Sequence, residues 1–394
     1  MQVLSYTTFS ARVAARGAGD RVPLSGAIEV SRRCPLHCVQ CYNNLPMADT
    51  TARCAELSTA EHHRILDEIA EAGCLWLLYT GGEIFARPDF LDIYTHAKRR
   101  GLLVTLFTNG TLITPRIADH LSRFRPFSIE ITLYGATAAT YERVTGVPGS
   151  YERCLRGIRL LTERGLAPKL KTVSLTINRH ELWQMQRLAE EAGLEFAFDA
   201  QINPRIDCTL GPLAVRLDPA AVVALDLQDP RRLAEWRQLA ERFGRPGAWP
   251  ARSDALYDCG GGINSFAIDP EGMLTICVIS HHDRFDLRQG SFQEGWGGFL
   301  RKVRAQKITR PTACAACSLR WMCAMCPANG HLENGDAEQP VAFLCQTSHL
   351  RAYALGVPVA PHGDCPYCEG GAGYGALAGA RAALGAMPTA SRNP

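Results

Sequence analysis

Residues 24–44 read LSGAIEVSRRCPLHCVQCYNN, and this stretch decides the fold class. Its first eight residues form an apolar run typical of a buried strand, and three cysteines follow directly. Cys34, Cys38 and Cys41 have the spacing C-x3-C-x2-C. Three thiols this close in sequence can hold one metal centre at the carboxyl end of a strand, where barrels of parallel strands place their active sites.

Five more apolar runs follow the first one, and helical stretches separate them. The runs cover residues 74–80, 102–108, 126–134, 170–177 and 194–198. Ser58 opens one helical stretch with Glu61 three residues later, which is a capping-box pattern. Repeated β-α units predict an α/β fold with a parallel sheet or barrel, and six strands are too few for a full eight-stranded barrel.

The composition excludes several classes of protein. The 394 residues include 42 Lys and Arg against 39 Asp and Glu, a balance that argues against a protein built mainly for nucleic acid. No run of 18 apolar residues is present, and residues 1–20 lack the core of a secretory signal. We therefore expect a cytoplasmic protein with no membrane or nucleic-acid partner. In that reducing compartment, 16 cysteines indicate metal binding or catalysis rather than disulfides.

The cysteine loop resembles that of the radical S-adenosylmethionine (SAM) superfamily. Tyr42 after the third cysteine also matches, whereas Gln40 stands where the family more often has an apolar or aromatic residue. The resemblance implies a [4Fe-4S] cluster on Cys34, Cys38 and Cys41 whose open iron binds SAM. Reductive cleavage of SAM would then release a 5′-deoxyadenosyl radical that abstracts a hydrogen atom. From the three cysteines alone, a partial zinc site or structural site is the alternative.

Later strand ends carry further segments similar to the family's motifs. Residues 80–83 (TGGE) resemble its GGE segment, although Ile84 stands where proline is usual, and residues 108–111 (TNGT) resemble its T-N-G turn. The resemblance spans residues 24–200 and implies a partial (β/α)6 TIM-like barrel. The SAM-binding residues that it implies are Tyr42, Gly81, Gly82, Glu83, Asn109, Thr132 and Asn178.

A second cysteine group resembles the SPASM extension of radical SAM enzymes. Its pattern is C-x12-G-x4-C, then C-x2-C-x5-C-x2-C, then a last cysteine. The resemblance implies two auxiliary [4Fe-4S] clusters, for a total of three. One would use Cys314, Cys317, Cys323 and Cys345, and the other Cys259, Cys277 and Cys326.

The second of these auxiliary sets lacks a fourth cysteine. Either one iron is open to substrate, or a residue such as Cys365 closes the site. Zinc at one or both sites is the alternative, because thiolates accept zinc as well as iron–sulfur clusters. Cys365 and Cys368 form a C-x2-C pair without the βαβ context of a thioredoxin-type site, so we interpret them as a tail pair or as ligands.

We predict five segments along the chain. An N-terminal segment (1–23) precedes the radical SAM partial barrel (24–205) and a helical linker (206–258). A small cysteine-rich SPASM domain (259–350) follows, in which metal supplies part of the stability. The chain ends in a Gly/Ala-rich tail (351–394), which we expect to be loosely ordered.

The resemblance implies an oxidoreductase that modifies a ribosomally made peptide or protein by crosslinking, epimerisation or oxidation. Its partners would be that substrate and an electron donor such as flavodoxin or ferredoxin. For a peptide substrate we expect either a separate leader-recognition protein or direct binding by the barrel. The first alternative is an enzyme of the same superfamily acting on a small molecule or tetrapyrrole. A non-enzymatic alternative is an iron–sulfur electron carrier or zinc-binding module. No catalytic residue is assigned, although Asp199, Asn203, Arg205 and Asp207 are candidates to line the substrate end.

Overall fold

The computed structural model describes residues 6–245, 247–249 and 253–386, and these divide into two compact units. The first contains the described residues up to Val215 together with Cys259–Ala305. The second contains the described residues of Arg216–Asp258 and those from Gln306 onward. The predicted segment 259–350 is therefore divided between the units. The outer ends of predicted segments 1–23 and 351–394 lie outside the described residues.

The first unit contains the six predicted strands, in the predicted order and all parallel. They are β1 (Ser25–Glu29), β4 (Trp76–Thr80), β5 (Leu103–Thr108), β6 (Ser128–Thr132), β7 (Lys169–Val173) and β8 (Phe196–Asp199). Buried and half-buried residues alternate along β4, β5, β6 and β7, and Ile28 and Val104 are fully buried. The predicted α/β class with a partial TIM-like barrel is thus confirmed.

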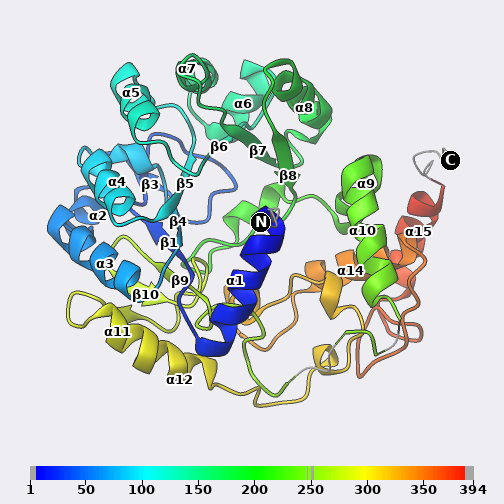
Figure 1. Cartoon of the computed structure of the whole chain (residues 1–394). Coiled ribbons are helices and arrows are strands. Elements are labelled where there is room, and N and C mark those ends of the chain that lie inside the picture. The colour runs from blue at the N-terminus through cyan, green and yellow to red at the C-terminus, as the bar shows by residue number, and fades with distance from the viewer. Residues whose placement is uncertain (1–5, 246, 250–252, 387–394) are drawn as a thin grey trace, which may run out of the picture. The chain divides into compact units, whose positions relative to one another are not determined.

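Amphipathic helices connect these strands and cover their outer side (Figure 1). They are α3 (Thr59–Glu71), α4 (Phe90–Arg99), α5 (Pro115–Arg123), α6 (Ala138–Thr145), α7 (Ser150–Thr162) and α8 (Leu182–Glu191). The predicted capping box opens α3, since Ser58 Oγ accepts from the Glu61 N–H while Glu61 accepts from the Ser58 N–H. Ile65 and Ile69 of α3 are completely buried, so the apolar face of the helix lies against the sheet.

Three strands from a distant part of the sequence extend the same sheet beyond β1. Strand β9 (Ser265–Ile268) pairs with β1 in parallel, while β10 (Met273–Thr275) and β11 (Phe285–Asp286) continue in antiparallel fashion. Gly26 makes this pairing possible, because a Cβ there would lie 2.3 Å from Cζ of Phe266. The segment α11 (Phe292–Glu294), η4 (Gly295–Phe299) and α12 (Leu300–Arg304) follows, and the Phe292 ring packs 4.8 Å from that of Phe266.

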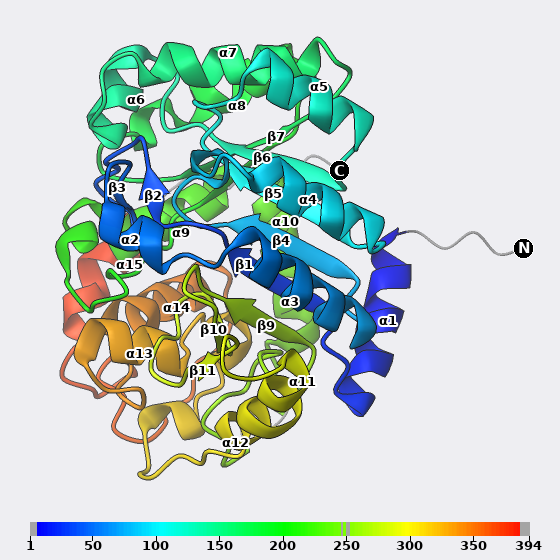
Figure 2. The same cartoon turned by 90° about the vertical axis from the view of Figure 1, so that its left-hand side faces the viewer.

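Short elements occupy the two ends of the parallel strands. Helix α1 (Tyr6–Asp20) lies at the amino ends, and Tyr6 contacts Phe127 just before β6 at 5.2 Å between ring centroids. Figure 2 shows β2 (Arg33–Cys34), β3 (Leu45–Pro46) and α2 (Thr50–Ala55) at the opposite, carboxyl end. Three 3₁₀ turns, η1 (Ile84–Ala86), η2 (Arg179–Glu181) and η3 (Gly211–Val215), complete the connections.

The second unit is helical. Its helices are α9 (Pro219–Gln228), α10 (Pro230–Phe243), α13 (Pro327–Asn334), α14 (Ala342–Ala354) and α15 (Ala378–Gly385), with short turns η5 (Ala313–Ala315), η6 (Arg320–Met322) and η7 (Gly375–Leu377). Helices α9 and α10 lie within the predicted helical linker (206–258). Of the helices that the structure describes, none combines the length and apolar character of a membrane span.

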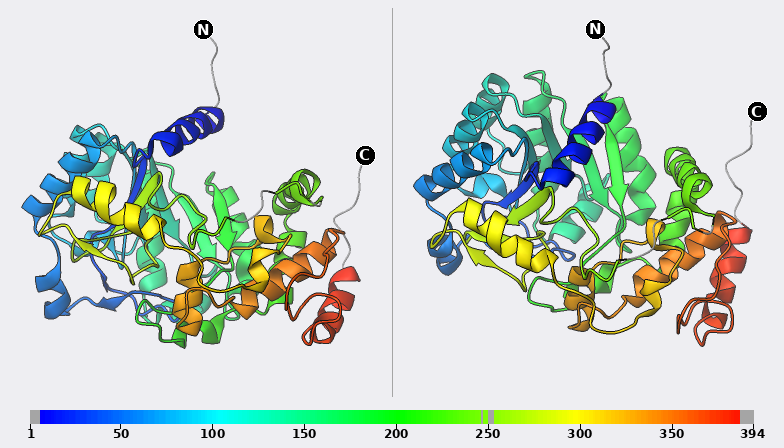
Figure 3. Two further views of the ribbon diagram at one scale, coloured as in Figure 1. Left: turned by 90° about the horizontal axis from the view of Figure 1, so that it is seen from below. Right: turned by 60° about the horizontal axis from the view of Figure 1, so that its bottom comes forward.

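The described part of the tail differs from the expected loose order. Leu377 and Leu384 pack with Val223 of α9 and Leu350 of α14 in one buried cluster. Figure 3 shows α15 beside α14. Composition did not reveal this packing, because two leucines among many Gly and Ala residues give little periodic signal.

Candidate active site at the cysteine loop

The cysteine loop is held at its base and along its length. Strands β2 (Arg33–Cys34) and β3 (Leu45–Pro46) pair in parallel and close the base of the loop. Further along, the backbone N–H of His37 donates to the Thr145 carbonyl at 2.8 Å, which anchors the loop to the end of α6. The chain after β1 is thus fixed at the carboxyl ends of the strands, as predicted for an active-site loop.

The residues after β8 hold the loop from another side. The Arg205 guanidinium donates to Asn44 at its side-chain oxygen (3.1 Å) and its carbonyl oxygen (3.0 Å). Asp199 and Asp207 instead accept hydrogen bonds from nearby backbone N–H groups and so stabilise local turns. Of the four candidates for the substrate end, Asn203 faces the cavity described next.

A cavity of about 240 Å³ lies beside the loop. Its wall includes these residues predicted for the SAM and cluster site: Cys34, Cys38, Cys41, Tyr42, Gly81, Gly82, Asn109 and Thr132. The remaining two predicted residues, Glu83 and Asn178, are not part of the wall. Their side chains are buried and bind the protein itself.

Gly81 and Gly82 pack against the backbone that leads into the cysteine loop. A Cβ on Gly81 would lie 2.3 Å from the carbonyl oxygen of Ser31, and one on Gly82 would lie 2.4 Å from that of Arg32. Gly81 also has φ +125°, a conformation that side chains rarely adopt. The Gly82 N–H donates to Ser31 O at 2.7 Å, so the two strand ends are joined directly. The absence of a side chain at these glycines therefore allows two segments of the protein's own backbone to approach each other closely.

Glu83 ties the ends of β4 and β5 together. Its carboxylate accepts from the Thr108 hydroxyl at 2.7 Å and from the backbone N–H of Asn109 at 2.8 Å. Asn109 in turn directs Nδ2 to Cys34 Sγ at 3.5 Å. Burial raises the pKa of Glu83, while these hydrogen bonds oppose the rise. Glu83 therefore positions Asn109 and, through it, contacts the cysteine loop.

Tyr42 lines the cavity with its hydroxyl bound to a buried acid. The hydroxyl donates to Glu29 Oε1 at 2.6 Å, and Asn43 Nδ2 donates to the same oxygen at 2.5 Å. Burial raises the pKa of Glu29 to about 7, although the Tyr42 hydrogen bond lowers it. Glu29 lies within an apolar strand, and that isolated charge was the available sequence signal for it.

Asn178 acts on the backbone near the end of β7. Its Oδ1 accepts from the Leu175 N–H at 2.7 Å, and its Nδ2 donates to Tyr134 O and Val173 O, both at 3.1 Å. Strand β7 ends at Val173, earlier than the apolar run predicted, so Asn178 lies beyond the strand end. The Asn178 side chain therefore holds the segment after β7 in place and is not part of the cavity wall.

Lys171 is a cavity residue that the sequence did not reveal. Its Nζ lies 2.7 Å from the centroid of the Phe107 ring and 3.2 Å from Glu130 Oε2. Burial lowers the pKa of Lys171 to about 8, and the Glu130 charge opposes that shift. A charged residue within an apolar strand was again the available signal.

The donor set fits an iron–sulfur cluster. Burial raises the pKa of Cys34 to about 12 and raises those of Cys38 and Cys41, so these thiols need a cationic centre to be held as thiolates. The buried Oε1 of Gln40 has no hydrogen-bond partner among the described residues, which leaves an acceptor available beside the thiols. Three soft thiolates on one loop, with a free acceptor nearby, suit a cluster that binds a further molecule.

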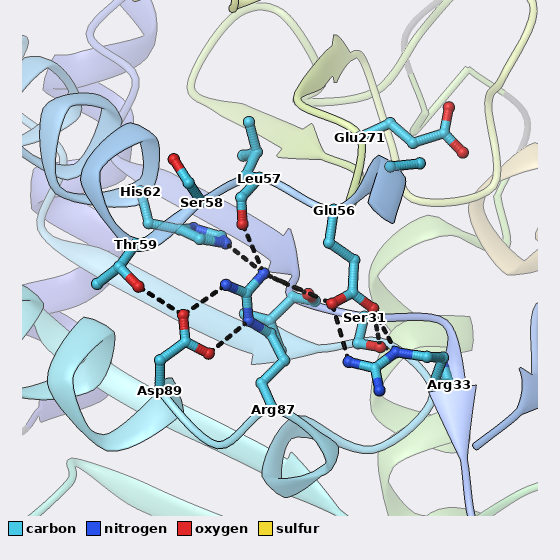
Figure 4. A network of polar contacts seen from close by, with 12 residues as sticks. Ser31, Arg33, Glu56, Leu57, Ser58, Thr59, His62, Arg87, Asp89 and Glu271 are labelled. Atoms are coloured by element: carbon cyan, nitrogen blue, oxygen red, sulfur yellow. Dashed lines mark hydrogen bonds and ion pairs between the residues drawn. The ribbon is translucent and has the colours of Figure 1, made fainter. Parts of the chain in front are cut away.

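A buried polar network supports the start of the loop (Figure 4). Glu56 accepts two hydrogen bonds from Arg33, each at 2.9 Å, and one from the Ser31 hydroxyl at 2.5 Å. Arg87 lies 3.8 Å from Glu56 and binds Asp89 at 2.7 Å. Because Arg33 directly precedes Cys34, these ion pairs help to set the position of the first cysteine.

The second cysteine group is distributed over both units. In the first unit, burial raises the pKa of Cys277, and the charge of Cys259 adds to that shift. In the second unit, burial raises the pKa of Cys317 to about 12, with further contributions from Cys323 and Cys314. Burial is also the main cause of a raised pKa at Cys345, and the charges of Cys365, Cys323 and Cys317 raise it further. The ligand set Cys314, Cys317, Cys323 and Cys345, and the set that includes Cys326, remain predictions.

Comparisons with known proteins place part of the chain in a family. Residues 28–192 match the radical SAM superfamily. The chain is 26% identical over 330 residues to an AdoMet-dependent heme synthase of Methanosarcina barkeri, covering 79% of this chain and 93% of that protein. It is 33% identical over 171 residues to a PqqA peptide cyclase of Gluconobacter oxydans, covering 43% of this chain and 47% of that protein.

The fold is also similar to that of a solved protein. Streptococcus suis SuiB, bound to S-adenosylmethionine, aligns with a TM-score of 0.64 and 15% identity, covering 87% of this chain and 82% of SuiB. SuiB bound to its precursor peptide SuiA aligns with a TM-score of 0.62 and 17% identity, covering 85% of this chain and 80% of that one. A radical SAM domain implies a four-iron cluster and SAM. This chain is a radical SAM enzyme, and residues 28–192 are its radical SAM domain.

Proposed function

We propose that this enzyme modifies a ribosomally made peptide or protein. The observation that carries the proposal is the chemistry of the cavity beside the cysteine loop. Its wall carries side-chain amides at Gln40, Asn43, Asn44, Asn109, Gln201 and Asn203. Lys171 is the one Lys, Arg, Asp or Glu among the described residues that line it. Amides suit the alternating donors and acceptors of a peptide backbone.

The chain's own residues would hold the cofactor as follows. Cys34, Cys38 and Cys41 bind the [4Fe-4S] cluster, and Asn109 donates to the Cys34 sulfur. When bound, the cluster supplies the electron that cleaves SAM to methionine and a 5′-deoxyadenosyl radical. Thr132 and the Gly81 and Gly82 backbone face the cavity and would contact SAM. Glu83 and Asn178 act as positioning residues behind them.

The cavity's electrostatics favour a peptide over an acidic substrate. Lys171 already makes an ion pair with Glu130 at 3.2 Å, and burial lowers its pKa to about 8. A substrate that carries several carboxylates would need more cationic partners than this cavity offers. A neutral peptide segment has no such need.

The second candidate is an enzyme that acts on a tetrapyrrole in cofactor biosynthesis. It is favoured by the match to the heme synthase, which covers 93% of that protein. The PqqA peptide cyclase is more similar in sequence, but that match covers 47% of its length. We prefer a peptide to a tetrapyrrole as the substrate because of the chemistry of the cavity wall.

The remaining cofactors and partners belong to the same proposal. Two auxiliary [4Fe-4S] clusters would use the second cysteine group and would accept an electron from the substrate or bind it. The enzyme would receive electrons from a flavodoxin or ferredoxin. A separate protein would present the leader of the peptide.

The first test is SAM cleavage by the reconstituted and reduced enzyme, followed by chromatography of 5′-deoxyadenosine. We expect cleavage by the wild type, none by Cys38→Ala, and wild-type activity in Cys54→Ala, whose thiol is exposed. Iron analysis should give about 12 atoms per chain for three clusters. About eight atoms would contradict one of the auxiliary sites.

The second test separates the two substrate classes. Short peptides encoded beside the gene and a tetrapyrrole precursor of heme are each incubated with enzyme and SAM, and the products are analysed by mass spectrometry. We expect a peptide to change mass or to take up deuterium from heavy water. Conversion of the tetrapyrrole with no change in any peptide would overturn the peptide assignment while leaving SAM cleavage intact.

A further inference from the structure

Four buried side chains of the second unit converge on one point outside the radical SAM site. They are His349 of α14, His362 in the following loop, and Cys365 and Cys368 of the C-x2-C pair. Each is at most 7% exposed. One ligand atom from each lies within 4.8 Å of the others. Two thiols and two imidazoles form a donor set that zinc accepts in proteins.

The distances between these atoms match the edges of a tetrahedron. Cys368 Sγ lies 3.5 Å from His349 Nε2 and 3.9 Å from His362 Nε2, and Cys365 Sγ lies 3.7 Å from His349 Nε2. Zinc–sulfur and zinc–nitrogen bonds in tetrahedral geometry place sulfur and nitrogen ligands about 3.6 Å apart. The four side chains therefore surround a space of the size that one ion needs.

A hydrogen bond sets the orientation of the His349 ring. His349 Nδ1 lies 2.8 Å from the carbonyl oxygen of Cys345, which can only accept. The Nδ1 atom therefore carries the proton, and Nε2, which faces both thiols, presents its lone pair to them. His362 has a comparable contact, since its Nδ1 lies 3.0 Å from the carbonyl oxygen of Ala360, and this leaves Nε2 as its ligand atom. Such contacts behind the ligands are usual at protein metal sites.

The backbone of the C-x2-C pair is a compact turn. The Gly371 N–H donates to Cys368 O at 2.9 Å, and the Cys365 N–H donates to His362 O at 3.2 Å. A Cβ on Gly371 would lie 2.6 Å from the carbonyl oxygen of Cys365, so glycine is needed for the turn to close. Tyr367 joins this turn to α14, since Gln346 Nε2 donates to its hydroxyl at 2.8 Å.

We propose that His349, His362, Cys365 and Cys368 form a mononuclear zinc site that fastens the tail to α14. A binuclear cluster would place the thiols and imidazoles on different metal atoms and so separate them further. The tail around the site has little apolar area, with Leu377 and Leu384 as its buried leucines. A structural metal supplies stability where the apolar core is small.

The zinc site would also help to position one of the predicted ligands of an auxiliary cluster. Cys345 lies one helical turn before His349, and its sulfur is 3.8 Å from His349 Nδ1. Fixing His349 would therefore help to position Cys345, which also contacts Cys365. In this arrangement Cys365 belongs to the zinc site and does not close an iron–sulfur cluster.

The test is metal analysis of the full-length protein, purified without oxygen and with its clusters reconstituted. We expect about one zinc per chain in addition to iron. Cys368→Ala and His362→Ala should lose the zinc and keep the iron, whereas Cys54→Ala should keep both. His362→Cys preserves a four-ligand set and should retain zinc, which separates loss of a ligand from loss of the fold.

A spectroscopic measurement accompanies the metal count. Replacement of zinc by cobalt in the full chain should give the visible bands of a tetrahedral ion with thiolate ligands, and Cys368→Ala should lack them. Two results would overturn the proposal. One is a wild-type protein with no zinc that also fails to bind cobalt. The other is a Cys368→Ala variant that loses about four iron atoms, since that would make Cys368 a cluster ligand.

Discussion

Asn109 Nδ2 donates a hydrogen bond to Cys34 Sγ at 3.5 Å, although the two residues are 75 positions apart. The contact depends on Glu83, which accepts from the Asn109 backbone at 2.8 Å. It depends also on Asn109 Oδ1, which accepts from the Thr111 N–H at 2.9 Å. Hydrogen bonds to cluster sulfurs influence the reduction potential, because they stabilise the added negative charge of the reduced state. The residues at the end of β5 therefore influence the reduction potential of the site.

Replacing Asn109 tests this contact. Asn109→Asp keeps the oxygen that accepts from Thr111 but removes the donor to Cys34. We expect the reduction potential of the SAM cluster to fall by on the order of tens of millivolts, measured by a redox titration followed by electron paramagnetic resonance. Asn203→Asp adds the same charge to the cavity wall and serves as the control. An equal fall in both variants would contradict a specific role for the Asn109 hydrogen bond.

Glu56 is expected to be essential for stability. Its side chain is 7% exposed and neutralises Arg33, with Arg87 3.8 Å away. Glu56→Ala would leave the buried Arg33 without its ion-pair partner, whereas Arg87 would keep Asp89. We expect a loss of about 3–5 kcal/mol in the free energy of unfolding, measured by denaturation. Asp119→Ala breaks an ion pair of an exposed carboxylate with Arg164 and should cost less than about 1 kcal/mol. Comparable losses in the two variants would refute this assignment.

Gly82→Ala should separate the ends of β1 and β4. The new Cβ would lie 2.4 Å from the Arg32 carbonyl oxygen and 2.7 Å from that of Arg33, and neither backbone atom can move alone. We expect weaker SAM binding and a lower iron content, measured by calorimetry and metal analysis. Gly379→Ala in α15 meets no atom within 4 Å and should stabilise the protein by roughly 1 kcal/mol. Normal SAM affinity in Gly82→Ala would contradict the close approach.

His62 should make the protein sensitive to acid. Burial lowers its pKa from 6.5 to about 3, with the Arg87 charge as the next cause. As pH falls below 6.5, His62 takes up a proton in the unfolded chain before it does so in the folded protein. The contribution of neutral His62 to the folded state is therefore present above pH 6.5 and is lost as pH falls toward 3. Between pH 7.5 and 5.5 this loss is about 1.4 kcal/mol.

The measurement is the urea midpoint at those two pH values. His62→Gln keeps an acceptor for Arg87 without a titrating ring and should show a smaller shift than the wild type. His180→Gln, in which an exposed histidine is replaced, should keep the wild-type shift. An unchanged pH dependence in His62→Gln would exclude His62 as the cause.

Local sequence patterns were sufficient to predict the parallel strands and the placement of the cysteine loop. The apolar runs predicted all six strands, because burial on both faces requires nearly continuous apolar residues. They overestimated β7, where Leu175 and Ile177 continue the apolar run but lie beyond the strand end at Val173. Apolar character indicates that a residue is buried, and hydrogen bonds to a neighbouring strand decide whether it belongs to the sheet.

The sequence by itself determined the thiols that can share a metal and the strand from which their loop emerges, since both depend on spacing along a short piece of chain. Only the tertiary structure decided that Glu83 and Asn178 bind the protein's own backbone and that Lys171 lines the cavity. It alone also brought His349 and His362 next to the C-x2-C pair. These relationships depend on which distant segments pack together, and on the burial and hydrogen bonding that result. Neither is encoded in the local pattern of residue types.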